Sequence, residues 1–260
     1  MGRARQYRLR HSFRGLIVPV LLFFAWEIAA RLWLAKTILI PPPSEVVRTL
    51  WTLLLDGTLV AHTVSSILRV LSGFVISFLF ALPLGLLMGW NRLAHELFDT
   101  TVQIFRPIPG TAWVPAAILL FGIGDKPALF LIFMGTIWPI LLSTIHGVRN
   151  ISKHFIWAAL TMGADRRRLF TKVVFPAALP SIFTGCRVGM GVAWTFVVVA
   201  ELIAVRTGLG YMIMEARLIV RPDIVFAGMI AIGVVGLGLD WLARTAMRRF
   251  LRWQKGLVLE

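Results

Sequence analysis

Several charged side chains stand within long apolar stretches of the sequence, among them Arg69, Arg187 and Glu201. A charge inside hydrocarbon costs on the order of several kcal/mol unless a counter-ion or water satisfies it, so each is a candidate for ion pairing or for contact with a passing ion. Arg69 and Glu201 fall at similar depths of two antiparallel stretches, and we expect them to pair. The pair either fixes helix packing or takes part in gating and solute passage.

Arg187 lies about midway along its apolar stretch, where a fixed positive charge would favour an anion crossing a bilayer. An interhelical hydrogen bond is the alternative role. Trp194 lies between Arg187 and Glu201, and this position suggests a residue that lines or gates a pathway; packing against lipid or against other helices is the alternative. Glu27 and Asp240 are interpreted as hydrogen-bonded packing residues.

None of the patterns that support covalent or metal chemistry is found. The five histidines lack the spacing of metal ligands, and no Ser/His/Asp set or pair of carboxylates suggests catalysis. The phosphate loop Gly-x-x-x-x-Gly-Lys-Ser/Thr is also missing, so we expect the chain to bind no nucleotide, metal or cofactor itself. The single cysteine, Cys186, excludes an internal disulfide framework. A membrane-embedded enzyme or a stand-alone channel is kept as an alternative of another class.

The elements that would position these residues are membrane-spanning helices. Of 260 residues, 58% are hydrophobic and 15% are charged, against roughly 25% charged in soluble domains. Several apolar runs reach the roughly 20 residues that a helix needs to cross the hydrocarbon layer. We therefore predict an all-α, polytopic membrane protein with about six spans, at residues 15–34, 63–90, 101–121, 128–148, 177–205 and 224–247.

The basic residues predict how these spans are oriented. Seventeen Lys and Arg fall in one set of alternating connections and six in the other, and the richer set is expected on the cytoplasmic side. This places a basic N-terminus (1–14) and a C-terminus (249–260) in the cytoplasm, on either side of one membrane domain (15–248). Since the net charge of +15 is gathered at the ends of apolar runs, nucleic acid is not an expected partner, whereas membrane lipid is.

A short helix is expected on the external side, between the first two spans. Ser44, which follows three prolines, is predicted to cap it. Its apolar side would carry five residues: Val46, Val47, Leu50, Leu53 and Leu54.

The longest cytoplasmic connection, residues 149–176, predicts two helices joined by a glycine bend. Ser152 is placed to cap the first helix, Gly163 to end it in the left-handed conformation, and Asp165 to cap the second. The second helix would carry Leu169, Phe170, Val173 and Val174 on one exposed face and end at Pro176. Such a helix would lie either in a groove of another protein or on the membrane surface, attracted by anionic lipid.

The same segment resembles the loop that defines the permeases of bacterial binding-protein-dependent ABC importers. In that family Glu-Ala-Ala is followed after three residues by Gly, and after nine more by an aliphatic residue, any residue, a large apolar residue and Pro. The matching residues here are Ala158, Ala159, Gly163, Val173, Phe175 and Pro176. Trp157 stands in place of the family's glutamate, so a polar contact made by that glutamate is not expected.

Further stretches in the same order extend this resemblance over nearly the whole chain. It is closest to the branch that imports nitrate, taurine, alkanesulfonates, bicarbonate and some pyrimidine-like compounds. The stretches are Trp26–Glu27, Pro41–Ser44, Ser66–Phe74, Pro107–Pro109, Phe121–Asp125, Pro176–Pro180, Gly185–Arg187, Ala193–Trp194, Ala200–Leu202 and Gly208–Tyr211.

The resemblance implies a type I importer permease in a bacterial plasma membrane, working by alternating access. Its expected partners are a second permease copy, two cytoplasmic ATPase subunits that bind ATP and magnesium, and an extracytoplasmic solute-binding protein. The expected solute is a small anion, with a neutral or cationic compound as the alternative. The residues expected to couple the permease to the ATPase are Ala158, Ala159, Gly163, Ala164, Asp165, Leu169, Phe170 and Pro176.

Overall fold

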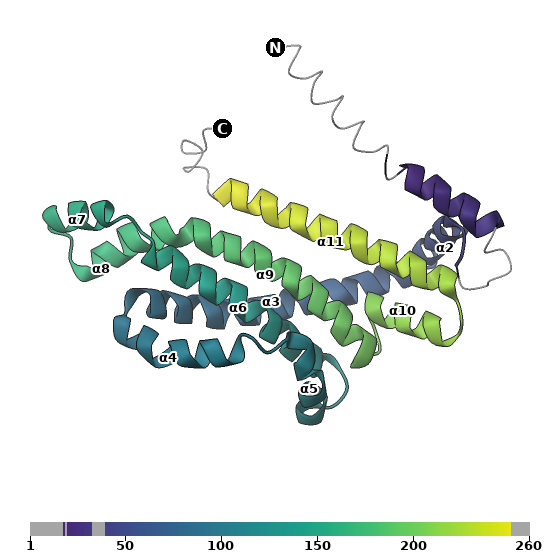
Figure 1. Ribbon diagram of the computed structural model, residues 1–260, viewed down its shortest axis with the longest axis horizontal. Helices are drawn as coiled ribbons and strands as arrows, with labels where there is room; N and C mark the ends of the chain where they lie inside the picture. The colour runs from purple at the N-terminus through teal and green to yellow at the C-terminus, as the bar shows by residue number, and fades with distance from the viewer. Residues whose placement is uncertain (1–17, 19, 33–39, 251–260) are drawn as a thin grey trace, which may run out of the picture.

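Four long helices form the body of the protein and lie roughly side by side (Figure 1). They are α3 (Thr58–Trp90), α6 (Asp125–Arg149), α9 (Phe175–Ile203) and α11 (Pro222–Phe250). The computed structural model describes residues 18, 20–32 and 40–250, and over these ranges it contains helices and loops but no strand. The predicted all-α class is therefore confirmed, and these four helices correspond to the predicted second, fourth, fifth and sixth spans.

The predicted third span, residues 101–121, is wrong as a single helix. A helix from Arg92 to Phe105 (α4) is followed by the short turn η1 (Gly110–Trp113) and by α5 (Val114–Phe121), and the two parts meet at an angle of 83°. The bend falls at Pro107 and Pro109, which lack the N–H groups that a continuing helix would need. The described residues thus hold four helices able to span a membrane, or five if the bent pair counts as one.

The predicted fifth span begins earlier than expected. α8 (Arg166–Arg168) passes into the π-helical segment η2 (Leu169–Val174) and then directly into α9, so that 166–203 is one continuous helix. Pro176 therefore does not end the second helix of the loop, and that prediction is wrong. Instead Pro176 occupies the first turn of α9, where the wider π-turn before it leaves room for the proline ring.

α2 (Pro43–Leu55) is fastened to the first predicted span, of which residues 20–32 are helical. We call this end of the molecule the external end, after the side on which the sequence predicts it to lie. Its N-cap is Pro42, not Ser44 as predicted. The carboxylate of Glu27 accepts hydrogen bonds from the Ser44 N–H (3.0 Å) and Oγ (2.9 Å), which confirms the hydrogen-bonded role of Glu27. The predicted N-terminus 1–14 and residues 251–260 lie outside the described ranges.

α10 (Leu209–Leu218) lies at the same end, and α7 (Lys153–Thr161) with α8 at the opposite end (Figure 1), which we call the cytoplasmic end after its predicted side. Between the two ends, α6 packs mainly against α3 and α9. These contacts are made where a side chain would not fit: a Cβ on Gly85 of α3 would lie 2.7 Å from Thr144 Cβ of α6, and one on Gly185 of α9 would lie 2.8 Å from the Pro139 carbonyl oxygen. Small residues let membrane helices approach this closely.

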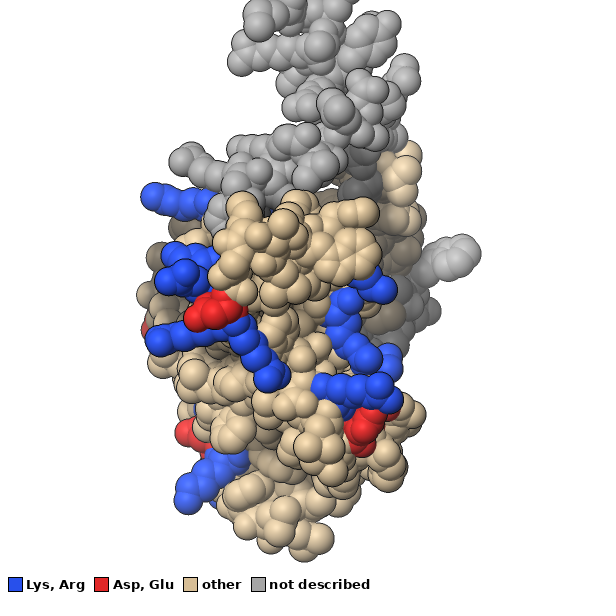
Figure 2. Space-filling model, turned by 90° about the vertical axis from the view of Figure 1, so that its left-hand side faces the viewer, with Lys and Arg blue, Asp and Glu red and all other residues tan. Residues whose placement is uncertain are grey.

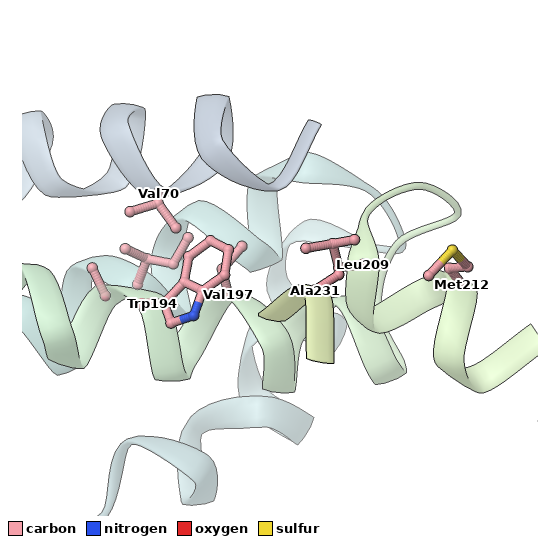
Figure 3. Packing of buried hydrophobic residues seen from close by; sticks show 8 residues of the cluster. Val70, Trp194, Val197, Leu209, Met212 and Ala231 are labelled. Carbon is pink, nitrogen blue, oxygen red and sulfur yellow. The ribbon is translucent and has the colours of Figure 1, made fainter. Parts of the chain in front are cut away.

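A second zone of packing joins α9 to α3, α10 and α11 (Figure 3). Val70 of α3, Trp194 and Val197 of α9, Leu209 of α10 and Ala231 of α11 are all buried there. This apolar cluster therefore joins α9 to three neighbouring elements.

The α3–α6 contact gives a direct test of the packing. Gly85→Ala should lower the thermal midpoint of the purified protein, because overpacking of this kind costs about 1–3 kcal/mol. Gly233→Ala in α11 is the matched control, since its Cβ would meet nothing within 4 Å and alanine favours a helix by about 1 kcal/mol. Equal midpoints for the two variants would contradict the packing described here.

Candidate functional site

α7 ends in the glycine bend that the sequence predicts. Gly163 has φ +79°, its N–H donates to the Leu160 carbonyl (2.9 Å), and the Ala164 N–H donates to the Ala159 carbonyl (3.0 Å). These two hydrogen bonds form a Schellman motif, in which the left-handed residue is usually glycine. At the start of α7, Ser152 holds the N-cap position, but its side chain makes no capping hydrogen bond.

After the bend, Asp165 caps the next helix as predicted. Its carboxylate accepts a hydrogen bond from the Arg168 N–H at 2.8 Å. Because the capped helix continues through η2 into α9, the bend is connected to a spanning helix without a break. We call residues 152–176, from the N-cap of α7 to the first turn of α9, the coupling segment.

The exposed apolar residues of the coupling segment are on α7 and its C-cap, not on the second helix as predicted. Phe155, Trp157, Leu160 and Met162 are each at least half exposed. Leu169, by contrast, is 6% exposed, because the continuous helix turns it toward Val148, Ala159 and Ala178.

The remaining predicted coupling residues divide between the outer surface and the packed side. Ala158, Gly163 and Asp165 are exposed, whereas Ala159 is buried, and Ala164 and Pro176 are partly buried. Phe170 is partly buried with its ring edge-on to Trp90 of α3 at 5.5 Å between centroids. The coupling segment therefore presents one face outward and fastens the other to the cytoplasmic ends of α3 and α6.

Basic side chains gather around this end of the molecule (Figure 2). In the coupling segment Lys153, Arg166, Arg167, Arg168 and Lys172 are all exposed, and Asp165 is the one acidic residue among its positions. A partner that binds here must therefore offer an apolar groove and acidic or phosphate groups around it.

The predicted pair of Arg69 and Glu201 is confirmed. Nη1 of Arg69 donates to Oε1 of Glu201 at 2.9 Å, and the two side chains are 10% and 0% exposed. Arg69 also donates to Asp125 Oδ1 (2.6 Å) and to the Thr207 carbonyl oxygen (2.8 Å). Asp125 and Thr207 were not anticipated, because neither lies inside an apolar run.

Glu201 is surrounded by donors from the chain that follows α9. It accepts hydrogen bonds from the Gly210 N–H (2.9 Å) and from Ser66 Oγ (2.8 Å), and Ser66 Oγ in turn accepts from the Leu209 N–H (2.9 Å). A Cβ on Gly208 would lie 2.1 Å from Glu201 Oε1, so only glycine allows this approach. The pair thus holds the loop before α10 against α3.

Arg187 forms an interhelical ion pair with Asp240 of α11. Its Nε donates to Asp240 Oδ1 at 2.9 Å, with side chains 40% and 37% exposed. Asp240 also accepts from Arg244. A hollow of about 380 Å³ adjoins the pair and is lined in addition by Thr184, Val188, Gly191 and Met247. Arg187 is therefore hydrogen-bonded to another helix and lies beside a small cavity, and Asp240 is hydrogen-bonded as expected.

Trp194 lies between α9 and α11 and is 9% exposed. Its Nε1–H donates to the Ile232 carbonyl at 3.1 Å, and its ring fills the space above Gly236. Figure 3 shows its ring beside Val197, within the buried cluster. Trp194 is therefore packed against another helix, as in the alternative to a gate given above.

A larger cavity of about 980 Å³ opens beside the cytoplasmic halves of α6 and α9. We call it the basic vestibule; its lining consists of Arg106, Leu142, Ser143, Ile145, His146, Arg149, Asn150, Pro180, Ser181 and Thr184. It holds two arginines and a histidine but no carboxylate. Sequence reasoning missed it, although Ser143, His146 and Asn150 recur at the spacing of one helix face.

Comparison with known proteins places this geometry in a family. Residues 81–252 match the family described as the binding-protein-dependent transport system inner membrane component. This chain belongs to that family. The permease is also 42% identical over 243 residues to a Methanocaldococcus jannaschii protein named as an ABC transporter permease, with 92% of this chain and 91% of the other covered.

Two further comparisons agree with this assignment. The taurine transport system permease protein of Escherichia coli is 33% identical over 237 residues, covering 89% of this permease and 86% of that protein. Among solved structures, a chain of the MetNI methionine ABC transporter aligns with a TM-score of 0.66 at 18% identity, over 75% of this permease and 97% of that chain. At that identity the likeness shows the fold alone, and it agrees with the predicted type I importer permease fold.

The ion pair at the external end of the permease can be tested by a double-mutant cycle. Arg69→Ala should lower stability by about 3–5 kcal/mol, because it leaves Glu201 buried without its counter-ion. Arg69→Ala combined with Glu201→Ala should lose less than the sum of the two single changes. Thermal unfolding of the four proteins in one detergent measures this, and additive losses would show that the two side chains act independently.

Proposed function

We propose that this permease is the membrane subunit of an ATP-driven importer and moves a small anionic solute into the cell. Two copies would form the pathway, each bound to one cytoplasmic ATPase subunit that binds ATP and magnesium. An external solute-binding protein would deliver the cargo. The permease itself would hold no cofactor and catalyse no reaction, and it would lie in a bacterial plasma membrane with both termini and the coupling segment in the cytoplasm.

The proposed ATPase-coupling role rests on one observation: the coupling segment has an exposed apolar side and an opposite side that is packed against the membrane domain. Phe155, Trp157 and Leu160 are exposed to a partner on one side, while Ala159 and Leu169 are packed into the membrane domain on the other. A groove on the ATPase that received the exposed side chains would gain roughly 25 cal/mol for each Å² of apolar surface buried. Any displacement of that groove would reach α9 through packed contacts.

The continuity of the coupling segment with α9 supports its role in transmission. A helix resists bending far more than a loop does, so movement of α8 and η2 would turn α9 as well. α9 carries Glu201 at its external end, so the same movement would reach the loop that Glu201 holds. Inward-open and outward-open states could then be interchanged by nucleotide at one end and the loaded binding protein at the other.

The charge of the basic vestibule supports an anionic cargo. Arg106 and Arg149 both line the cavity, and its lining contains no carboxylate to neutralise them. Nη1 of Arg149 also contacts Nε2 of His95, at 2.6 Å. Such fixed charges attract an anion and repel a cation. Taurine, for which one relative is named, carries a sulfonate group that such charges would attract.

The exposed face of α9 supports a second copy. Thr184, Gly191 and Thr195 lie on one face of the helix and are exposed, although the helix is apolar enough to span. Small and hydroxyl-bearing residues are typical of contacts between membrane helices and of water-filled paths rather than of lipid-facing surfaces. We therefore place the axis of the dimer along this face.

The bend offers a test of coupling. Gly163→Val should abolish transport-linked ATP hydrolysis, because a β-branched residue is strained at φ +79°. Gly163→Asn is the matched control and should keep most of the coupling, since asparagine tolerates the left-handed region. The assay compares ATP hydrolysis with and without loaded binding protein in proteoliposomes. Full stimulation in the valine variant would remove Gly163 from the coupling role.

The anionic cargo is tested at the vestibule. Arg106→Gln should raise the KM for import about tenfold, because it removes one of two fixed charges from the path. Arg92→Ala is the control, since Arg92 pairs with Glu96 on the surface and does not line the vestibule. The assay uses whichever of taurine, nitrate and bicarbonate the wild type imports. A wild type that imports a neutral or cationic solute, and none of these, would contradict the proposal.

A further inference from the structure

A second cavity, separate from the basic vestibule, lies where the coupling segment meets the cytoplasmic end of α3. Its volume is about 530 Å³, and its lining is mostly apolar with two arginines. We call it the α3 groove; it is lined by Pro83, Leu86, Leu87, Trp90, Arg166, Arg167 and Phe170. None of these residues lines the basic vestibule, so the groove is not part of the proposed solute path.

Aromatic contacts hold the mouth of the groove in shape. The rings of Trp90 and Phe170 meet edge to face at 5.5 Å, and the guanidinium carbon of Arg166 lies 6.0 Å from the centre of the Trp90 ring. A guanidinium placed over a ring keeps its N–H groups free at its edges for an oxyanion. Within the part of the chain that the structure describes, neither Arg166 nor Arg167 forms an ion pair with a carboxylate.

The floor of the groove continues into a purely apolar face of α3. Leu79, Phe80, Pro83 and Leu87 follow one another at helical spacing and are all exposed. This face lacks the threonine and glycine positions that mark the exposed face of α9. On a helix long and apolar enough to span a membrane, such a surface is suited to contact acyl chains.

We propose that the α3 groove binds one anionic phospholipid, with its phosphate on Arg166 and Arg167 and an acyl chain along Pro83 and Leu87. Basic side chains at a helix end with an apolar wall below them match a lipid, which has both an anionic headgroup and an acyl chain. A free anion has no part that would bind the apolar wall. The site lies on the cytoplasmic side if the orientation proposed above is right, but its chemistry does not depend on the solute or on the direction of transport.

Depth favours a lipid over the ATPase as the occupant. Pro83 lies seven residues before Trp90 on α3, which places it about 10 Å further into the membrane at a rise of 1.5 Å per residue. A soluble subunit that docks on the exposed face of α7 would have to enter hydrocarbon to reach it. A phospholipid spans this distance with its own headgroup and chain.

A lipid in this place would add a further contact between the coupling segment and α3. Its phosphate would bind α8, and its chain would pack on α3, beside the contact of Trp90 with Phe170. It would therefore hold the coupling segment against the domain and make the efficiency of coupling depend on anionic lipid. The sequence leaves two alternatives for this segment: docking in a groove of a partner protein, or contact with lipid. Under this proposal both would apply, since α7 would dock on the partner and α8 would bind lipid.

The test measures lipid retention by the full-length permease with native mass spectrometry, using phosphatidylglycerol and phosphatidylcholine as probes. Replacing both Arg166 and Arg167 by alanine should weaken phosphatidylglycerol binding roughly 25-fold, since each basic residue near an anionic headgroup contributes about a fivefold change in affinity. Arg168→Ala combined with Lys172→Ala is the matched control: it also removes two charges from exposed positions of the same segment, and neither residue lines the groove. Its effect should stay below about twofold.

A second variant tests the apolar part and does not depend on the arginines. Leu87→Trp should fill the groove and weaken phosphatidylglycerol binding as well, while inorganic phosphate in millimolar excess should not displace the lipid from the wild type. Equal retention of the two lipids by the wild type would overturn the proposal. So would a double arginine variant that binds phosphatidylglycerol normally but no longer assembles with the ATPase, because the ATPase would then be the occupant.

Discussion

Close backbone contact between α6 and its two neighbours is the constraint on which the rest of the domain depends. Lipid tails are as apolar as leucine, so helices in a bilayer gain little from burying apolar surface and must associate through van der Waals contact. Gly85 lets α3 approach Thr144, and Gly185 lets α9 approach the backbone at Pro139. The positions of α3 and α9 are thereby set relative to one helix, and both ends of the molecule are built on them.

At the external end, charge supplements this packing. Arg69 and Glu201 are buried together, and the loop before α10 supplies the remaining donors. A charge that cannot be hydrated must be surrounded by the protein itself, and this need fixes the loop more firmly than apolar contact would. At the cytoplasmic end the packing is apolar, with Leu169 and Ala159 against Val148. α9 takes part in both ends, which gives a mechanical path between them.

The arginines within or beside the spans have different surroundings, and these surroundings explain their different roles. Arg69 and Arg187 are matched by carboxylates of other helices and hold the packing. Arg106 and Arg149 face a cavity without carboxylates. Arg166 and Arg167 face an apolar groove at the end of α3. A count of basic residues would treat all six alike, whereas the carboxylates and cavities beside each one separate the arginines that have a counter-ion from those that we propose to contact solute or lipid.

Features that depend on near neighbours along the chain follow from the residues alone. Runs of about 20 apolar residues specify spans, Gly163 specifies a bend, and Asp165 caps the helix after it; the depth of Arg69 and Glu201 even predicted their pairing. The direction in which each side chain faces depends instead on how the helices pack. Leu169 is packed rather than exposed, Trp194 is buried against α11, Asp125 joins the ion pair, and the helix at Arg106 bends away. The physical reason is that an apolar side chain is stabilised by leaving water, and lipid, the protein core and a partner protein provide this equally well.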